Sequence, residues 1–289
     1  MALRGWRFAL AALVAAAPGL TKAADMPSAA PAAVPMPSAS VPAPDWIVTV
    51  GAEARLLPAW PGARESKLIP AGFPLFDIRD AGTPPSYFGP RDSFGFSVLN
   101  LGGLKIGPAV QLVWERVASR HTELNGLGDV NFAVQAGAFA EFWPMPWLRL
   151  RTELRQGLGG ETGVTGDAFL DAVVPVGQFR FSGGPRLTAQ SAAAVSPYFS
   201  ITAAQSAAST VSGLPMLPPY NAGGGLYSYG AGSQAEYFFN PQWATHAFFE
   251  YERLTGSAAN SPLVTQRGSP NQLILGLGAT YSFTMNSLW

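Results

Sequence analysis

Cysteine is absent from the 289-residue chain, and histidine occurs only twice, as His121 and His246. The lack of cysteine excludes disulfide frameworks and thiolate metal sites. The two histidines are not spaced as a pair of metal ligands, and no G-x-S-x-G nucleophile motif occurs. The sequence therefore predicts no metal, no cofactor and no thiol chemistry.

Charge is also scarce. Charged residues make up 12% of the chain, about half the usual share of a soluble domain, and lysine occurs only at positions 22, 67 and 105. The formal net charge is zero and no block of basic residues occurs, which argues against a surface that binds nucleic acid. Apolar residues reach 48%, so much of the surface must face something other than water.

Long apolar runs are missing as well. The longest run near the N-terminus, Phe8 to Ala17, has ten residues and follows Arg4 and Arg7. Ten residues are too few to span a bilayer as a helix, which needs roughly 20, but this arrangement is typical of a secretory signal peptide. We expect residues 1–24 to be that signal peptide, followed by a cleavage site before Asp25.

Residues 25–44 are nearly all Pro, Ala, Ser, Val and Met, a composition that buries little and predicts a disordered, extended segment. From Asp45 onward the apolar residues follow a period of two instead of forming runs. In WLRLRTELRQGLGG (147–160) the even positions are mostly leucine, while Arg149, Arg151, Glu153 and Arg155 occupy odd positions. The segments GDVNFAVQAGAFAEF (128–142) and NQLILGLGATYSFTMNSLW (271–289) alternate in the same way, which predicts amphipathic strands.

Two folds accommodate many such strands. A soluble sandwich buries the apolar faces, whereas a membrane barrel turns them toward lipid and keeps a polar interior. The scarcity of lysine, the alternation of short and long connections, and aromatic residues at predicted strand ends favour the barrel. Those aromatics are Trp46, Trp114, Phe142, Trp143, Trp147, Tyr237, Phe239, Trp243 and Tyr251. We therefore expect residues 45–289 to form a closed, antiparallel transmembrane β-barrel with a polar lumen.

The barrel is expected to have about twelve strands, with ten as the fallback. Eleven strands can be placed by alternation, at 46–58, 67–80, 93–101, 104–117, 127–142, 146–158, 165–176, 178–190, 224–239, 242–255 and 271–284. Because a single-chain barrel with both ends on one side of the membrane needs an even number, we expect a further short strand around Ser86 to Gly89.

Charged residues on the polar parity are predicted to line the lumen. They are Arg149, Arg151, Glu153, Arg155, Asp167, Asp171, Arg180, Arg186, Glu250 and Glu252. The arginines need acidic partners, which are expected among Glu53, Glu115, Asp129, Glu141, Asp167, Asp171, Glu236, Glu250 and Glu252. Two interpretations are open: the charges fill and stiffen the interior, or they line a narrow pore and select solutes.

Enzymatic chemistry is not expected. A hydrolase would need a nucleophile or activated water beside a general base, most often histidine. His246 falls on the inward parity, His121 lies in a predicted external loop, and no Ser or Asp motif accompanies either of them.

Several segments resemble the MipA/OmpV family of Gram-negative outer-membrane proteins. They are GLGDVNFAVQAGAFAEF (126–142), ELRQGLGG (153–160), YFSITAAQSAAS (198–209), YNAGGGL (220–226) and SPLVTQRGSPNQLILGLGATYSF (261–283). The resemblance extends from about Val50 to Phe283. It implies an exported barrel in the outer membrane of a Gram-negative bacterium, in contact with outer-membrane lipid. It also implies a scaffold that links a lytic murein transglycosylase to a bifunctional penicillin-binding protein.

Other functions remain open. A porin-like channel would pass small solutes through the charged lumen, and an adhesin would act through the external loop 190–222. That loop contains SITAAQSAAST, which is Ala-rich and begins with residues that cap helices, so a short helix is expected there. The loop could equally fold over the barrel mouth as a lid.

Overall fold

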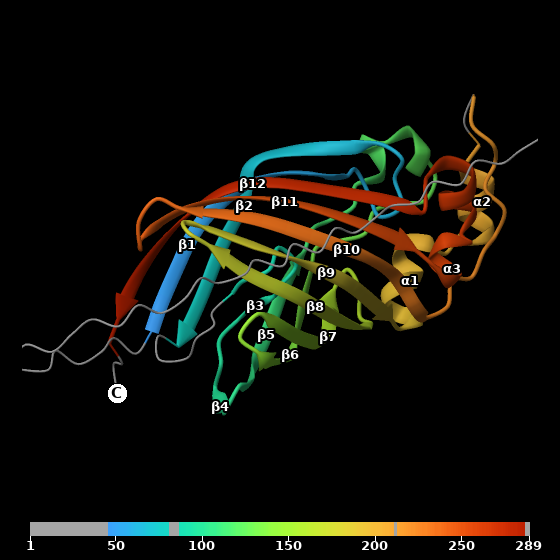
Figure 1. Ribbon diagram of the computed structural model, residues 1–289. Coiled ribbons are helices and arrows are strands. Elements are labelled where there is room, and N and C mark those ends of the chain that lie inside the picture. Colours follow the sequence, from blue (N-terminus) through green and yellow to red (C-terminus); the bar gives the residue numbers. More distant parts are fainter. Residues whose placement is uncertain (1–45, 81–86, 211–212, 287–289) are drawn as a thin grey trace, which may run out of the picture. The chain divides into compact units, whose positions relative to one another are not determined.

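The computed structural model describes residues 46–80, 87–210 and 213–286 (Figure 1). The predicted signal peptide and the Pro/Ala-rich segment lie outside these residues. The described chain forms one 12-stranded antiparallel sheet that curls strongly (Figure 1). Its strands are β1 (Trp46–Pro58), β2 (Ser66–Asp80), β3 (Phe94–Gly95), β4 (Leu99–Leu101), β5 (Leu104–Val113), β6 (Ala133–Met145), β7 (Leu148–Gly159), β8 (Val164–Val176), β9 (Phe179–Gln190), β10 (Gly225–Phe238), β11 (Trp243–Leu254) and β12 (Asn271–Met285).

The strand order is β2-β1-β12-β11-β10-β9-β8-β7-β6-β5-β3, and β4 also pairs with β5. Every pairing of strands within the described residues is antiparallel. The first strand, β1, pairs with the last strand, β12. The predicted all-β antiparallel architecture is therefore confirmed. Apolar and polar residues alternate along each strand, so each strand has one apolar and one polar face, and this favours a sheet with two chemically different sides.

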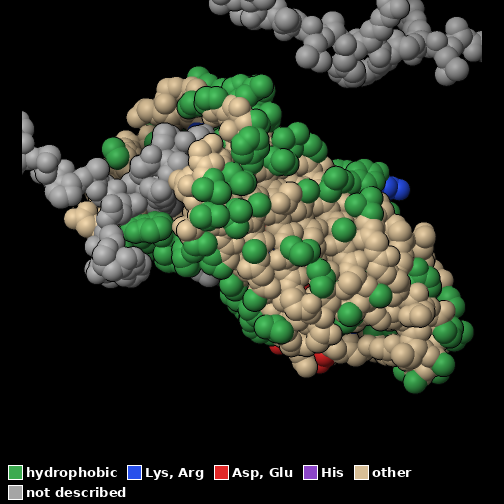
Figure 2. Space-filling model, turned by 90° about the horizontal axis from the view of Figure 1, so that it is seen from below, with side chains coloured by type: hydrophobic (Ala, Val, Ile, Leu, Met, Phe, Trp, Pro, Cys, Tyr) green, Lys and Arg blue, Asp and Glu red, His purple; other side chains and the backbone are tan. Residues whose placement is uncertain are grey.

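The two faces of the sheet follow the predicted parity. In β7 the odd residues from Arg149 to Arg155 are at most 6% exposed, whereas Leu150 and Leu154 are 40% and 63% exposed. This arrangement is the reverse of that in a water-soluble protein, which buries its apolar side chains. It also holds in β11, where Glu250 and His246 point inward and Phe249 is exposed. Figure 2 shows apolar side chains spread over the visible face with almost no charged ones among them.

The connections at one end of the sheet are short and those at the other end are long, as expected. The long connections form a cap that contains α1 (Ala192–Phe199), α2 (Ala203–Ala208), α3 (Gly256–Ala259) and the short helical turns η1 (Ala118–Arg120), η2 (Thr122–Leu124) and η3 (Leu263–Arg267). The helix expected in SITAAQSAAST is α2, which begins with a reciprocal capping box between Thr202 and Gln205. Among the helices that the structure describes, none is both long and apolar enough to cross a membrane.

The cap has its own apolar core. Phe199, Val264 and Leu254 pack in one cluster, and Trp60 and Leu263 belong to a second cluster beside it. This core shortens two predicted strands: β5 ends at Val113 and β6 begins at Ala133, and the intervening residues retain only an isolated bridge from Arg116 to Val130. The prediction of strands reaching from 104 to 117 and from 127 to 142 was wrong at these ends.

The two edges of the sheet run in the same direction. β2 runs from the cap end, where Ser66 pairs with Pro58, to the end at which Trp46 starts β1. β3 and β4 run the same way, because β4 leads into the tight turn before Leu104. Cα atoms of β2 and β3 come within 8 Å of each other, and no β2–β3 ladder is present within the described residues. Hydrogen-bonded closure of the barrel remains a prediction.

The short strand expected around Ser86 to Gly89 is not present at 87–89, and the strand expected at 93–101 is divided into β3 and β4. Instead of adding a strand to the wall, residues 87–93 pass through the interior of the sheet. A wall strand would have exposed Arg91 and Asp92 at the edge, whereas the interior offers both of them charged partners.

One predicted interfacial aromatic also points inward. Trp143 is 8% exposed and donates a hydrogen bond from Nε1 to Glu141 at 2.7 Å. Trp143 shares the odd parity of Gln135 and Glu141, which places it on the buried face of β6. Trp114, Trp147, Trp243 and the other predicted aromatics remain at the strand ends, where Trp243 packs against Tyr281 with ring centroids 4.9 Å apart.

Candidate functional site

The interior of the sheet contains a continuous network of charged side chains. At its centre Arg149 is fully buried and donates from Nε to Glu141 at 2.9 Å and from Nη1 to Asp171 at 3.1 Å. Asp171 also pairs with Arg186 at 2.6 Å. The register of β7 on β8 explains the pair of Arg149 and Asp171, because these two residues lie directly opposite each other.

The neighbouring arginines of β7 continue the network toward the cap. Arg151 donates from Nε to Glu153 at 2.7 Å and also pairs with Glu141 at 3.3 Å. Arg155 pairs with Glu153 and with Asp167. Each arginine thus has at least two carboxylate partners, which a buried guanidinium requires to offset its lost hydration.

Residues 87–93, which we call the inserted segment, connect the network across the interior. Asp92 pairs with Arg149, and the Ser93 amide donates to Glu153 at 3.2 Å. Arg91 reaches Glu250 at 3.1 Å and Glu252 at 3.4 Å on the opposite side. The inserted segment therefore bridges β7 and β11, which are not neighbours in the sheet.

The sequence did not identify Arg91 and Asp92 as partners. Their one signal is an adjacent pair of opposite charges after Gly89 and Pro90, in a stretch without regular alternation. Conversely, two expected partners do not point into the interior at all: Glu115 pairs with the exposed Arg120, and Asp129 accepts from the Ala118 amide. Both belong to the shortened ends of β5 and β6 and thus to the cap.

All ten predicted lumen residues lie on the inward face. Nine are less than 10% exposed, namely Arg149, Arg151, Glu153, Arg155, Asp167, Asp171, Arg186, Glu250 and Glu252. Arg180 is apart from this network, near the short turns, where it pairs with Glu236 and stacks over the Phe238 ring at 5.0 Å. The structure thus brings nine of them together and places the tenth in a separate pair.

Two buried arginines hold the cap together. Arg267 donates to the carbonyls of Ser209 at 2.6 Å, Glu123 at 3.0 Å and Pro215 at 3.1 Å. It thus joins its own connection, between β11 and β12, to the β5–β6 and β9–β10 connections. Arg116 donates to the Tyr198 carbonyl at 2.7 Å. Burial lowers the pKa of Arg267, lowers that of Arg116 to about 10 and raises the pKa of Tyr198 to about 12.

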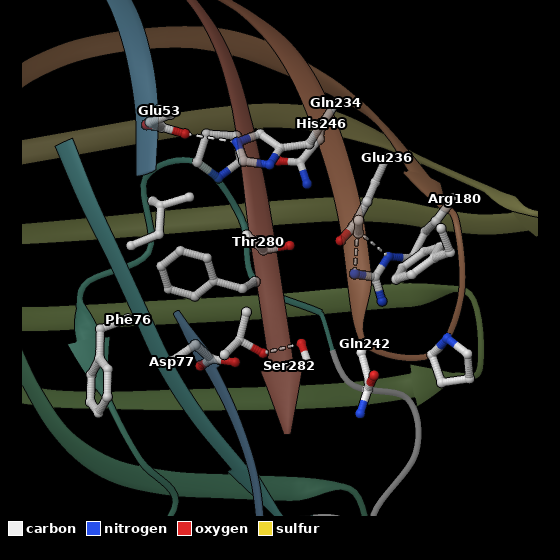
Figure 3. A pocket seen from close by; sticks show the side chains of 17 residues that line it. Glu53, Phe76, Asp77, Arg180, Gln234, Glu236, Gln242, His246, Thr280 and Ser282 are labelled. Atoms are coloured by element: carbon white, nitrogen blue, oxygen red, sulfur yellow. Dashed lines mark hydrogen bonds and ion pairs between the residues drawn. The ribbon is translucent and has the colours of Figure 1, made fainter. Parts of the chain in front are cut away.

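Two small pockets lie on the inner side of the sheet. One pocket near the short turns has a volume of about 50 Å³ and is lined by residues that include Glu53, Arg180, Glu236 and His246 (Figure 3). A second, near the edges of the sheet, has a volume of about 40 Å³. Each could hold a few water molecules. Within the described residues, no group of three or more acidic or histidine side chains has the geometry of a metal site.

Comparisons with solved structures give weak likenesses. An outer membrane channel from Pseudomonas putida F1 aligns over 87% of this chain and 100% of its own, with 10% identity and a TM-score of 0.41. Neisserial surface protein A aligns over 83% of this chain and 97% of its own, with 8% identity and a TM-score of 0.28. The CymD monoaromatic hydrocarbon channel aligns over 84% and 89%, with 9% identity and a TM-score of 0.32. Identities and TM-scores this low assign neither a fold nor a function to the chain.

No curated protein matches the chain. The family model described as MltA-interacting protein MipA, however, matches residues 50–283. This range begins in β1, ends in β12 and includes the inserted segment, the charged strands and the cap. The chain therefore belongs to the family of MltA-interacting protein MipA.

Proposed function

We propose that the chain is an outer-membrane β-barrel protein that conducts no solutes and acts as a membrane-anchored scaffold for murein enzymes. Its partners would be a lytic murein transglycosylase and a bifunctional penicillin-binding protein, together with outer-membrane lipid. The family description, MltA-interacting, supports a partner of this kind.

The outward face of the sheet supports the membrane location. Leu154, Leu277 and Leu158 are about 60% exposed, whereas the charged side chains of β7 point into the interior. In water this arrangement would expose apolar surface, whereas in a bilayer it places the apolar surface against lipid. A cleaved signal peptide at residues 1–24 would direct export. The short turns and the start of β1 would then face the periplasm, and the cap would face outward.

The main support for a protein that does not conduct is the inserted segment inside the sheet. It crosses the interior and bonds to both sides, through Arg91 to Glu250 and through Asp92 to Arg149. The cap adds a packed core at the other end. A pore needs a continuous path for water, whereas these contacts occupy the middle of that path.

The scaffold can be tested by affinity purification of the tagged protein from membranes, followed by mass spectrometry. We expect murein synthases and murein hydrolases to co-purify, and their recovery to fall when residues 26–44 are deleted. A variant with a scrambled 26–44 segment of equal composition controls for length. Recovery of no periplasmic enzyme from the wild type would contradict the scaffold.

Conductance in planar bilayers tests the competing assignment, a porin-like channel. We expect no channel activity for the wild type and none for Arg151→Ala. Stepwise wild-type conductance that changes ion selectivity in Arg151→Ala would show that the charged residues line a pore. An adhesive role would instead require the external loops, whose apolar residues here pack within the cap.

A further inference from the structure

Arg253 is an exception on the outward face of the sheet. Among the described strands β5 to β12 it is the single charged side chain at an outward-facing position. It is exposed and lies at the cap end of β11, directly opposite Asn271, the first residue of β12. An arginine is costly within the hydrocarbon layer of a bilayer but is tolerated where a strand reaches the headgroups. This position therefore suits a cation at headgroup level.

The hydrogen bonds of Arg253 leave most of its donors unused. Its Nη1 donates to Oδ1 of Asn271 at 2.7 Å, and the Tyr251 hydroxyl donates to the same oxygen at 2.8 Å. A guanidinium can only donate, so it fixes the amide of Asn271 with the oxygen toward Arg253 and leaves the amide nitrogen as a donor. No described residue bonds to that nitrogen, or to Nε and Nη2 of Arg253. Two adjacent strands thus present unused donors at this rim.

Arg64 adds a second cation beside these donors. It is exposed, lies in the connection between β1 and β2, and donates from Nη2 to the Gly268 carbonyl at 3.1 Å. The Ser269 amide donates to the Gly62 carbonyl at 2.8 Å, so the β1–β2 connection is joined to the chain just before β12 begins. Arg64 therefore lies at the same rim as Arg253.

The two cations have no acidic partner in the part of the chain that the structure describes. Neither Arg64 nor Arg253 forms an ion pair there, whereas Arg149 in the interior pairs with three carboxylates. Their neighbours in sequence do not neutralise them. Glu65 forms no ion pair with a described residue, and Glu252 points inward and pairs within the interior network. The rim therefore carries positive charge that an anion from outside the protein can balance.

We propose that Arg253, Asn271 and Arg64 bind the phosphate group of an anionic membrane lipid. Arginine holds phosphate oxygens through two parallel N–H bonds, and Nε and Nη2 of Arg253 are available for them. The acyl chains lie against Tyr251 and Leu273, which face each other on β11 and β12 and are 38% and 39% exposed. The site rests on the proposed membrane location, because a lipid of that bilayer brings a phosphate and apolar chains to this rim together.

The test titrates dihexanoylphosphatidic acid into the full chain in dodecyl maltoside micelles, which contain no phosphate, and measures binding by calorimetry. We expect saturable binding. Dihexanoylphosphatidylcholine has the same chains without the net charge, and inorganic phosphate has the charge without the chains. Each should bind at least about tenfold more weakly. Equal binding of the phosphatidylcholine would overturn the role of the cations, and equal binding of inorganic phosphate would overturn the assignment to a lipid.

Arg253→Gln removes the cation and keeps a side chain that can donate to Asn271, so it should fold. We expect it to bind dihexanoylphosphatidic acid about tenfold more weakly, with a further loss when Arg64→Gln is added. Arg120→Gln is the matched control, because Arg120 is an exposed arginine of the cap that already pairs with Glu115. It should bind this lipid as the wild type does.

Equal affinities of Arg253→Gln and Arg120→Gln would overturn the proposal, as would a heat signal no larger than that of empty micelles. Either result leaves the membrane location standing, because the assay in micelles does not depend on it. A wrong membrane location would appear elsewhere, as unfolding from liposomes that is insensitive to Leu154→Arg. A loss that follows Arg253 and Arg64 and spares Arg120 supports the lipid site.

Discussion

Arg149 and Asp171 face each other across β7 and β8 with both side chains fully buried and 3.1 Å between Nη1 and Oδ2. Glu141 and Asp92 complete the surroundings of the guanidinium. A burial this complete is tolerated only because every charge has a partner, and it makes the removal of one partner costly.

Arg149→Ala should therefore lower the free energy of unfolding by about 3–5 kcal/mol, since it removes the buried cation that the carboxylates of Asp92, Glu141 and Asp171 share. Urea titration of the protein in detergent, followed by tryptophan fluorescence, measures the change. Arg253→Ala, at an exposed arginine of β11, should cost less than about 1 kcal/mol. Equal losses in the two variants would show that the network does not stabilise the fold.

The outward face makes a separate prediction about the membrane. Leu154 lies in the middle of β7 and is 63% exposed, so Leu154→Arg should destabilise the protein in liposomes by about 2–4 kcal/mol. Leu226→Arg, near the cap end of β10, should cost only about 0–1 kcal/mol because its depth is smaller. Unfolding from liposomes in urea gives both values. A protein insensitive to Leu154→Arg would not have lipid against this face.

Much of the sheet could be predicted because its signal is local. The alternation of Arg149, Leu150 and Arg151 states which side chains point inward, and no distant contact is needed to read it. The short turns could be predicted for the same reason, because their signal lies in adjacent residues. The strand boundaries beside the cap were harder, because β5 and β6 end where Phe199 and Val264 pack, and those residues are distant in sequence.

The inserted segment could not be predicted for the same reason. Arg91 and Asp92 leave the wall because Glu250 and Arg149 attract them, and these partners lie 159 and 57 residues further along the chain. The odd number of predicted strands was the available sign of an irregularity between β2 and β3. It indicated that the chain between β2 and β3 crosses from one end of the sheet to the other. The alternation of residues alone could not show that this stretch runs through the interior instead of forming a strand of the wall.

The cap depends on Arg267. Because this side chain joins the carbonyls of Ser209, Glu123 and Pro215, Arg267→Ala should loosen the three loops without unfolding the sheet. We expect limited proteolysis to cut near residues 209–217 at least several times faster, with unchanged circular dichroism of the strands. Arg120→Ala, at a cap arginine that is 57% exposed, should be cut at the wild-type rate. An unchanged rate in Arg267→Ala would mean that the apolar cores alone hold the cap.

Glu161, in the loop between β7 and β8, introduces a dependence on pH. Burial raises its pKa above the ordinary value of 4.5, although the Gln135 amide and the charge of Arg155 act in the opposite direction. The unfolded chain thus releases this proton at a lower pH than the folded chain, so the contribution of Glu161 to the free energy of unfolding falls as pH rises through that interval. Glu161→Gln should therefore gain stability relative to the wild type as the pH rises above the ordinary carboxyl value of 4.5. Thr162→Val, which has no titratable group, should keep a constant difference from the wild type in the same urea titrations. A Glu161→Gln difference that stays constant with pH, or decreases, would contradict the raised pKa.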